Sequence, residues 1–148
     1  MNVFVKAFVF AFIAAIGNAL FVFAQKKSTA SQNPFLFLML ALITAIVLLG
    51  LASLAFPKVN YTEYIKENYK YALLTGLGIF ITYIGFYYLY SKYGASYYIL
   101  YAILSILTTS IVVGVVVFKE TFNVFYLLAI LSALLTIVLF YFGKQSQF

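Results

Sequence analysis

The side chains that could do chemistry in this chain are few and of few kinds. Its 148 residues include nine Lys and three Glu, for a formal net charge of +6, but no Arg, Asp, His, Cys or Trp. A chain without Cys and His lacks the usual nucleophiles, the usual general base, the commonest metal ligands and any disulfide. We therefore expect no enzyme, no metal site and no cofactor. A functional site would be built from hydroxyls, amides and the carboxylates.

Polar side chains inside long apolar stretches are the first candidates for such a site. Asn18 stands near the middle of the first stretch, where an amide needs hydrogen-bond partners that lipid does not supply. We expect it either to join helices or to contact a substrate. In the fourth stretch, Tyr101, Ser105 and Thr108 share one helical face when successive residues are placed about 100° apart. These hydroxyls either line a path for a polar solute or bond to carbonyls of their own helix.

The third apolar stretch carries a regular set of small side chains. Thr75, Gly78, Thr82 and Gly85 recur at steps of three, four and three residues, which places them on one helical face. A face of small residues lets another helix approach closely in a membrane. Tyr83 lies on a neighbouring face of the same stretch. The candidate substrate-binding residues are therefore Asn18, Thr82, Tyr83, Tyr101, Ser105 and Thr108.

Glu120 is the carboxylate that stands apart from the other two acidic residues. It follows Lys119 and precedes Thr121, between the fourth and fifth apolar stretches. At the start of a helix, the partial positive charge of the helix N-terminus would favour an ionised acid. We expect Glu120 either to cap and orient the turn or to take part in gating or ion coupling.

The elements that must position these residues are membrane spans. The chain is 66% hydrophobic and 8% charged, with a mean hydropathy of +1.10, whereas a soluble domain is roughly 25% charged. A helix needs about 20 mostly apolar residues to cross a bilayer. The sequence therefore predicts an all-α integral membrane protein with one transmembrane domain over residues 1–148. Its five predicted spans are residues 2–24, 35–56, 71–90, 95–118 and 122–142.

Residues 59–70, between the second and third spans, differ from the other connections. Asn60 followed by Glu63 resembles a capping box at the start of a helix. We expect a short helix here that lies at the membrane interface, with its tyrosines among the lipid headgroups. The alternative is an irregular polar loop.

The lysines report on orientation in the membrane and on partners. They occur singly or as one pair, so they form no basic stripe for nucleic acid. Five spans put five lysines on one side of the membrane and four on the other, which is almost no bias under the positive-inside rule. We expect insertion in both orientations and pairing of opposite copies as an antiparallel homodimer. The alternative is one orientation set by details of the loops.

The last two spans and the first resemble parts of a known transporter family. The segment Lys92-Tyr93-Gly94-Ala95-Ser96, the helix with Ser105 and Thr108, the turn Phe118-Lys119-Glu120-Thr121 and the final apolar helix resemble the end of an EamA-type half of the drug/metabolite transporter superfamily. The first span, with Gly17-Asn18 and the trailing Gln25-Lys26-Lys27, is similar to the opening helix of that family. In the turn, Phe-Lys stands before Glu120 where the family has glycine.

The resemblance implies two inverted five-helix repeats around a cavity near the bilayer centre, of which this chain supplies one. Related four-helix multidrug exporters carry an acid in the first span, and Asn18 in its place argues against proton-coupled export of lipophilic cations. We expect a carrier of small organic metabolites in a bacterial or archaeal plasma membrane, with lipids, a solute and a second copy as partners. A neutral, hydroxyl-rich wall would favour an uncharged or zwitterionic solute. The alternative is a non-transporting subunit of a larger membrane complex.

Overall fold

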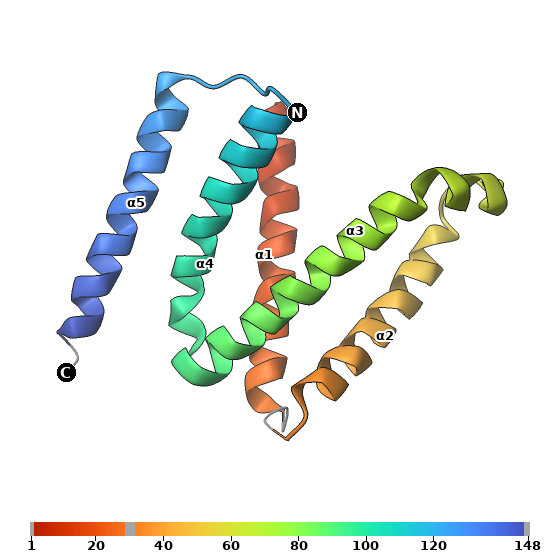
Figure 1. Cartoon of the computed structure of the whole chain (residues 1–148), viewed down its shortest axis with the longest axis horizontal. Coiled ribbons are helices and arrows are strands. Elements are labelled where there is room, and N and C mark those ends of the chain that lie inside the picture. Colours follow the sequence, from red (N-terminus) through yellow and green to blue (C-terminus); the bar gives the residue numbers. More distant parts are fainter. Residues whose placement is uncertain (1, 29–31, 147–148) are drawn as a thin grey trace. The chain divides into compact units, whose positions relative to one another are not determined.

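The computed structural model describes residues 2–28 and 32–146, which are mostly helical and include no strand. Five helices are long and apolar enough to cross a membrane, in the number and order that the sequence predicts (Figure 1). These candidate spans are Val3–Lys27, Pro34–Ser53, Tyr61–Tyr93, Ala95–Val117 and Val124–Gln145. The prediction of an all-α chain with five such helices is confirmed.

Two of the five spans change their helical winding along their length. The third joins an α-helix to one turn of π-helix, and the fourth joins a short 3-10 turn, an α-helix and a longer π-helix, in which hydrogen bonds run from residue i to i+5. The elements are α1 (Val3–Lys27), α2 (Pro34–Ser53), α3 (Tyr61–Tyr88), η1 (Leu89–Tyr93), η2 (Ala95–Tyr97), α4 (Tyr98–Ser105), η3 (Ile106–Val117) and α5 (Val124–Gln145).

Asparagine begins four of these helices. The side chains of Asn2, Asn33, Asn60 and Asn123 accept hydrogen bonds from backbone N–H groups in the first turns of α1, α2, α3 and α5. Each bond satisfies a donor that would otherwise have no partner inside the helix. In α2, Pro34 follows its cap at the first helical position, where its missing N–H costs nothing.

The largest difference from the predicted spans is at the start of the third. The sequence predicts a separate short helix within residues 59–70. The chain is helical from Tyr61 on, but these residues form the first turns of α3. Asn60 caps it as expected, and Asn68 Nδ2 donates to the Tyr64 carbonyl at 2.9 Å. No Pro or Gly interrupts residues 61–71, so the sequence offers nothing that would end the helix there.

Other helix ends differ from the predicted bounds by a few residues, each for a local reason. Helix α2 ends at Ser53 rather than 56, because residues 54–56 form tight turns ahead of Pro57. Helix α5 begins at Val124 rather than 122, because Asn123 is its cap, and it runs on to Gln145.

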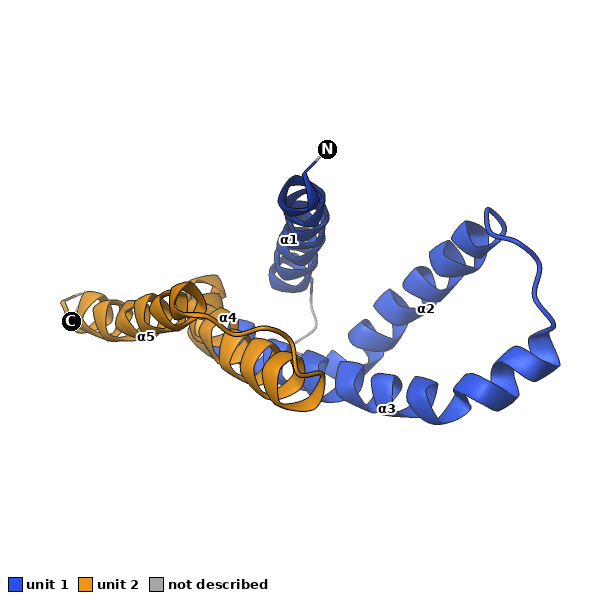
Figure 2. Ribbon diagram, turned by 90° about the horizontal axis from the view of Figure 1, so that it is seen from above, with its two compact units in different colours: residues 1–92 blue, residues 93–148 orange. Residues whose placement is uncertain are grey.

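The chain divides into two compact units, Met1–Lys92 and Tyr93–Phe148 (Figure 2). The hydrophobic side chains buried among the described residues are Leu38, Phe86 and Tyr90 in the first unit and Ile103 in the second. Most of the large apolar side chains on all five helices are exposed. Exposed apolar surface of this length and composition indicates a multi-pass membrane protein.

Candidate functional site

In the second unit, α4 and α5 contact each other and pack through aromatic rings at one end. The Tyr97 and Phe140 rings meet edge to face with centroids 5.2 Å apart. The Lys144 ammonium lies 5.2 Å from the Tyr97 centroid and 5.7 Å from that of Phe140. These contacts join the start of the fourth span to the end of the fifth, so they fix one end of the helix pair.

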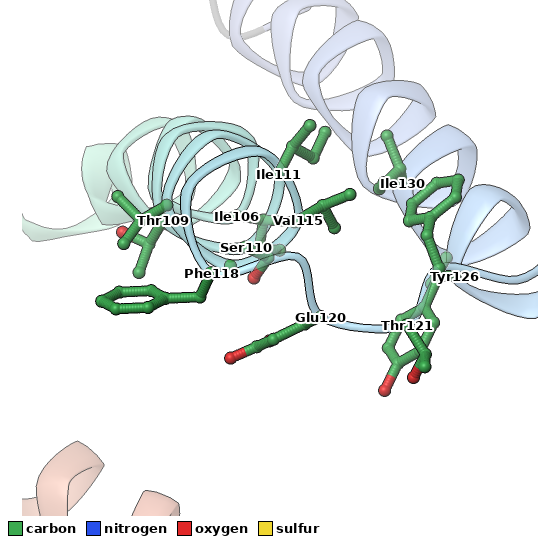
Figure 3. A pocket seen from close by; sticks show the side chains of 14 residues that line it. Ile106, Thr109, Ser110, Ile111, Val115, Phe118, Glu120, Thr121, Tyr126 and Ile130 are labelled. Carbon is green, nitrogen blue, oxygen red and sulfur yellow. The ribbon is translucent and has the colours of Figure 1, made fainter.

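At the opposite end of this pair, η3, the turn and α5 enclose a pocket of about 680 Å³ (Figure 3). A volume of this size lies within the range of roughly 300–1,000 Å³ that small-molecule sites occupy. Its polar side chains are Thr109, Ser110, Glu120, Thr121 and Tyr126. Phe118, Phe122 and aliphatic side chains of η3 and α5 complete the lining. The pocket therefore combines an apolar wall with a few polar groups, as binding sites for organic solutes do.

The turn after η3 directs Glu120 back toward that helix. Lys119 adopts φ 55°, and the Glu120 N–H donates to the Gly114 carbonyl at 3.0 Å. A Cβ added to the buried Gly114 would lie 3.0 Å from Glu120 Oε2 and 3.5 Å from its carboxyl carbon. The carboxylate thus rests against the helix where Gly114 has no side chain. Figure 3 shows the Glu120 side chain extending from the turn on the side of η3 where Ser110 and Phe118 lie.

The electrostatics of this pocket favour positive charge. Glu120 is the single charged residue among those that line it, and Lys119 is not part of the lining. The carboxylate also lies near the C-terminal end of η3, where unpaired carbonyls carry partial negative charge. Since both contributions have the same sign, a cation or a hydrogen-bond donor would be drawn to this point.

This placement differs from the helix-start position considered for Glu120. Helix α5 begins at Val124 and is capped by Asn123, whose Oδ1 accepts from Phe125 N and Tyr126 N at 3.0 and 3.1 Å. Glu120 lies three residues before that cap and contacts the end of η3 instead. It belongs to the turn as expected, while its role in gating stays a prediction.

The other candidates of the second unit lie outside the lining of this pocket. The Tyr101 ring lies 5.5 Å from that of Tyr98, Ser105 is half-buried at the end of α4, and the Thr108 hydroxyl donates to the Leu104 carbonyl at 2.9 Å. Their predicted common face assumed α-helical winding. The π-helix begins at Ile106, and its wider turns shift the residues beyond that point to other faces. Thr109 and Ser110 line the pocket in place of Thr108.

One candidate of the first unit, Tyr83, belongs to an aromatic ladder, which we define as Phe21, Tyr83, Phe86 and Tyr90. Phe21 stacks on Tyr83 at 5.2 Å and tilts against Phe86 at 6.1 Å, and Phe86 stacks on Tyr90 at 5.2 Å. Tyr83 also lines an apolar groove of about 230 Å³ between α2 and α3. Thr82, next to it, is half-buried.

Neither Asn18 nor the small-residue face makes a contact in the described structure that defines its role. Asn18 is half-buried in α1, and no side-chain hydrogen bond joins it to another described residue. Thr75, Gly78 and Gly85 are exposed, and a Cβ added to either glycine would meet no described atom within 4 Å. The packing role predicted for this face stays a prediction.

Gln25 is a buried polar residue that the sequence does not single out. It lies one turn after Phe21 in α1 and is 6% exposed, and neither side-chain amide atom has a hydrogen-bond partner among the described residues. Its position beside Lys26 and Lys27 suggests a solvated loop, which is why the composition gives no signal of burial. Buried amides of this kind destabilise a fold unless something satisfies them.

Comparisons with known proteins leave the family of the chain open. No family model matches the sequence, and no curated protein or solved structure is similar to it.

Proposed function

We propose that the chain is a membrane transporter of small organic metabolites that works by alternating access as an antiparallel homodimer of five-helix halves. In this proposal it is an EamA-type half of the drug/metabolite transporter superfamily and resides in the plasma membrane of a bacterium or archaeon. The pocket between η3 and α5 carries the proposal, because it offers solute-sized space, hydroxyls and one carboxylate.

Two further features support a carrier that needs a second copy. Apolar side chains are exposed along all five helices, so each helix has surface available for lipid or for another chain. The face of Thr75, Gly78 and Gly85 is one such surface, and its small side chains permit close helix contact. The nearly even division of lysines favours an inverted copy as the partner.

Transport is tested with the purified chain in sealed proteoliposomes exposed to a metabolite extract. We expect one or a few small solutes to be enriched inside these vesicles relative to protein-free vesicles, measured by mass spectrometry of the lumen. Glu120→Gln removes the charge from the pocket with little change of shape, so it should reduce this enrichment. If no solute enters faster than into protein-free vesicles, the chain is not a carrier.

Assembly and orientation are tested separately. Because the chain has no cysteine, Ser146→Cys gives one reactive thiol near the end of α5. A membrane-impermeant maleimide should label about half of the chains in intact cells if both orientations occur equally. Complete labelling or none contradicts dual insertion. Native mass spectrometry after mild extraction should show a homodimer, whereas a stable complex with a different chain would favour the role of a non-transporting subunit.

A further inference from the structure

We infer that the η3–α5 pocket binds the ammonium group of its ligand through the Glu120 carboxylate, and that Gly114 is the residue that allows this carboxylate to lie there. The role of such binding in transport rests on the proposed function, but the binding itself does not require transport. The sequence leads us to expect a neutral wall and an uncharged or zwitterionic solute. The pocket instead contains a carboxylate, so the inferred ligand has a positively charged group.

The charge of the ligand follows from the residues that line the pocket. Glu120 has no cationic side chain beside it in this lining, and its carboxylate adds to the partial negative charge at the end of η3. A negative site of this kind favours a positively charged group that donates hydrogen bonds, and such charge-assisted bonds are stronger than neutral ones. A carboxylate or phosphate ligand would be repelled.

The size and walls of the pocket distinguish an organic ammonium from a metal ion. About 680 Å³ is far more space than a single coordinated ion fills, and most of the lining is apolar. The Phe118, Phe122 and Tyr126 rings offer faces on which an ammonium or its apolar substituent can pack. The hydroxyls of Ser110 and Thr121 can accept the remaining N–H bonds.

Gly114 leaves room for the carboxylate. Glu120 Oε2 rests where a Cβ on this residue would lie 3.0 Å away, so an added Cβ would require the carboxylate to shift by a few tenths of an ångström. The Glu120 N–H bond to the Gly114 carbonyl holds the turn against the same residue. Gly114 is itself part of the pocket lining but has no side chain to offer a ligand, so we expect it to act by positioning Glu120.

An ammonium group could reach this turn from two sources. A dissolved amine carries one, and so does the headgroup of an aminophospholipid at the membrane interface. The shared chemistry is the ammonium group, and the two sources are separated by the composition of the bilayer in which binding is measured.

The experiment uses the full chain in nanodiscs of phosphatidylglycerol, which has no ammonium group. Phenethylamine is titrated by calorimetry at pH 7, where an alkylamine with a pKa of about 10 is charged, and 2-phenylethanol serves as the neutral probe of similar shape. We expect phenethylamine to bind about tenfold more tightly than 2-phenylethanol, the difference that a charge-assisted hydrogen bond typically makes. Equal affinity for the two probes would overturn the inference.

Two variants test the residues, and one serves as the matched control. Glu120→Gln removes the charge, so it should weaken phenethylamine binding about tenfold and leave 2-phenylethanol unaffected. Gly114→Ala keeps the charge but forces the carboxylate to shift by a few tenths of an ångström, so it should weaken phenethylamine binding by a smaller factor. Gly143→Ala, in α5 of the same unit, adds a Cβ that meets no described atom within 4 Å and should bind as the unaltered chain does. Unchanged phenethylamine binding in Glu120→Gln would refute the role of the carboxylate.

The source of the ammonium follows from adding phosphatidylethanolamine to the nanodiscs. Competition with phenethylamine would identify the lipid headgroup as a ligand, and undiminished binding would identify a dissolved amine. Amine binding without uptake into proteoliposomes would keep this inference and refute the transport function. Uptake of a neutral solute without amine binding would keep the transport function and refute this inference.

Discussion

The two units of the chain use aromatic side chains in different ways. In the first unit, the aromatic ladder brings α1 and α3 into contact through stacked rings, and Phe86 and Tyr90 within it are buried. In the second unit, the Phe118, Phe122 and Tyr126 rings border an open pocket together with hydroxyls and a carboxylate. The comparison indicates that the ladder holds helices together, while the pocket has side chains that a ligand can still engage.

The backbone shows the same difference. The aromatic ladder is built on α1, α3 and the first π-helical turn, so its residues recur at the three- and four-residue spacing of an α-helix over most of its length. The pocket is built on η3, a π-helix whose Thr109 and Ser110 are part of the lining. Local π-helical winding in proteins is frequently found at functional sites.

Breaking the ladder should have the largest effect on stability. Phe86 is 7% exposed and its ring contacts Phe21 and Tyr90. Phe86→Ala leaves a cavity among these rings and should lower the free energy of unfolding by about 3 kcal/mol, measured by denaturant titration in detergent micelles. Phe10→Ala removes the same side chain from a position that is 71% exposed and should change stability far less. Equal losses for both would show that the ladder does not hold α1 and α3 together.

Gln25 offers a way to stabilise the first unit. Its buried amide has no hydrogen-bond partner among the described residues, so Gln25→Leu removes an unsatisfied polar group from this unit. We expect this variant to be more stable by about 1–2 kcal/mol, which should raise its midpoint of thermal unfolding. A lower midpoint would mean that the amide is satisfied in the membrane.

The packed end of the second unit should contribute less than the ladder. Lys144 lies over the Tyr97 and Phe140 rings, and an interaction of this kind at an exposed site is worth roughly 0.5–1 kcal/mol. Lys144→Met keeps a long apolar side chain but removes the charge, so stability should fall by about that amount. An unchanged unfolding midpoint would show that the rings alone hold α4 to α5.

The smallest effect is expected for a substitution of Thr108. Comparing it with a substitution of Thr109 tests which hydroxyls line the ligand-binding pocket. Its hydroxyl bonds to the Leu104 carbonyl within the same span, so Thr108→Val should leave phenethylamine binding unchanged. Thr109→Val, one residue on, removes a hydroxyl from the pocket lining and should weaken binding severalfold. The reverse result would place the ligand on the face that α-helical spacing predicts.

Much of the fold could be predicted from the sequence, because lipid imposes strong constraints on it. The five spans follow from the lengths of the apolar stretches, and Asn60 marks a helix start that the structure confirms. The continuous helix α3 was not predicted. The charges of residues 63–70 suggested an interfacial segment, although charged residues do not by themselves end a helix.

The site could be predicted only in part. Glu120 stood out because it is an isolated acid, but its contact with Gly114 depends on the positive φ of Lys119, which the side chain of a lysine does not signal. Ser110 and Tyr126 were missed because no sequence pattern marks the π-helical winding that faces η3 toward the start of α5. The described residues form no hydrogen bond to the Asn18 side chain and leave Thr75, Gly78 and Gly85 exposed, so the roles of Asn18 and the small-residue face stay predictions.

The most direct test of this account compares solute exchange in two glycine variants, one from each unit. Gly114→Ala adds a Cβ 3.0 Å from the pocket carboxylate, which must then shift by a few tenths of an ångström, whereas Gly50→Ala in α2 adds a Cβ that meets no described atom within 4 Å. Each is reconstituted in proteoliposomes, and the exchange rate of the solute identified by mass spectrometry is measured. We predict that Gly114→Ala slows exchange and that Gly50→Ala does not. Unaltered exchange in Gly114→Ala would contradict the claim that this pocket carries the solute.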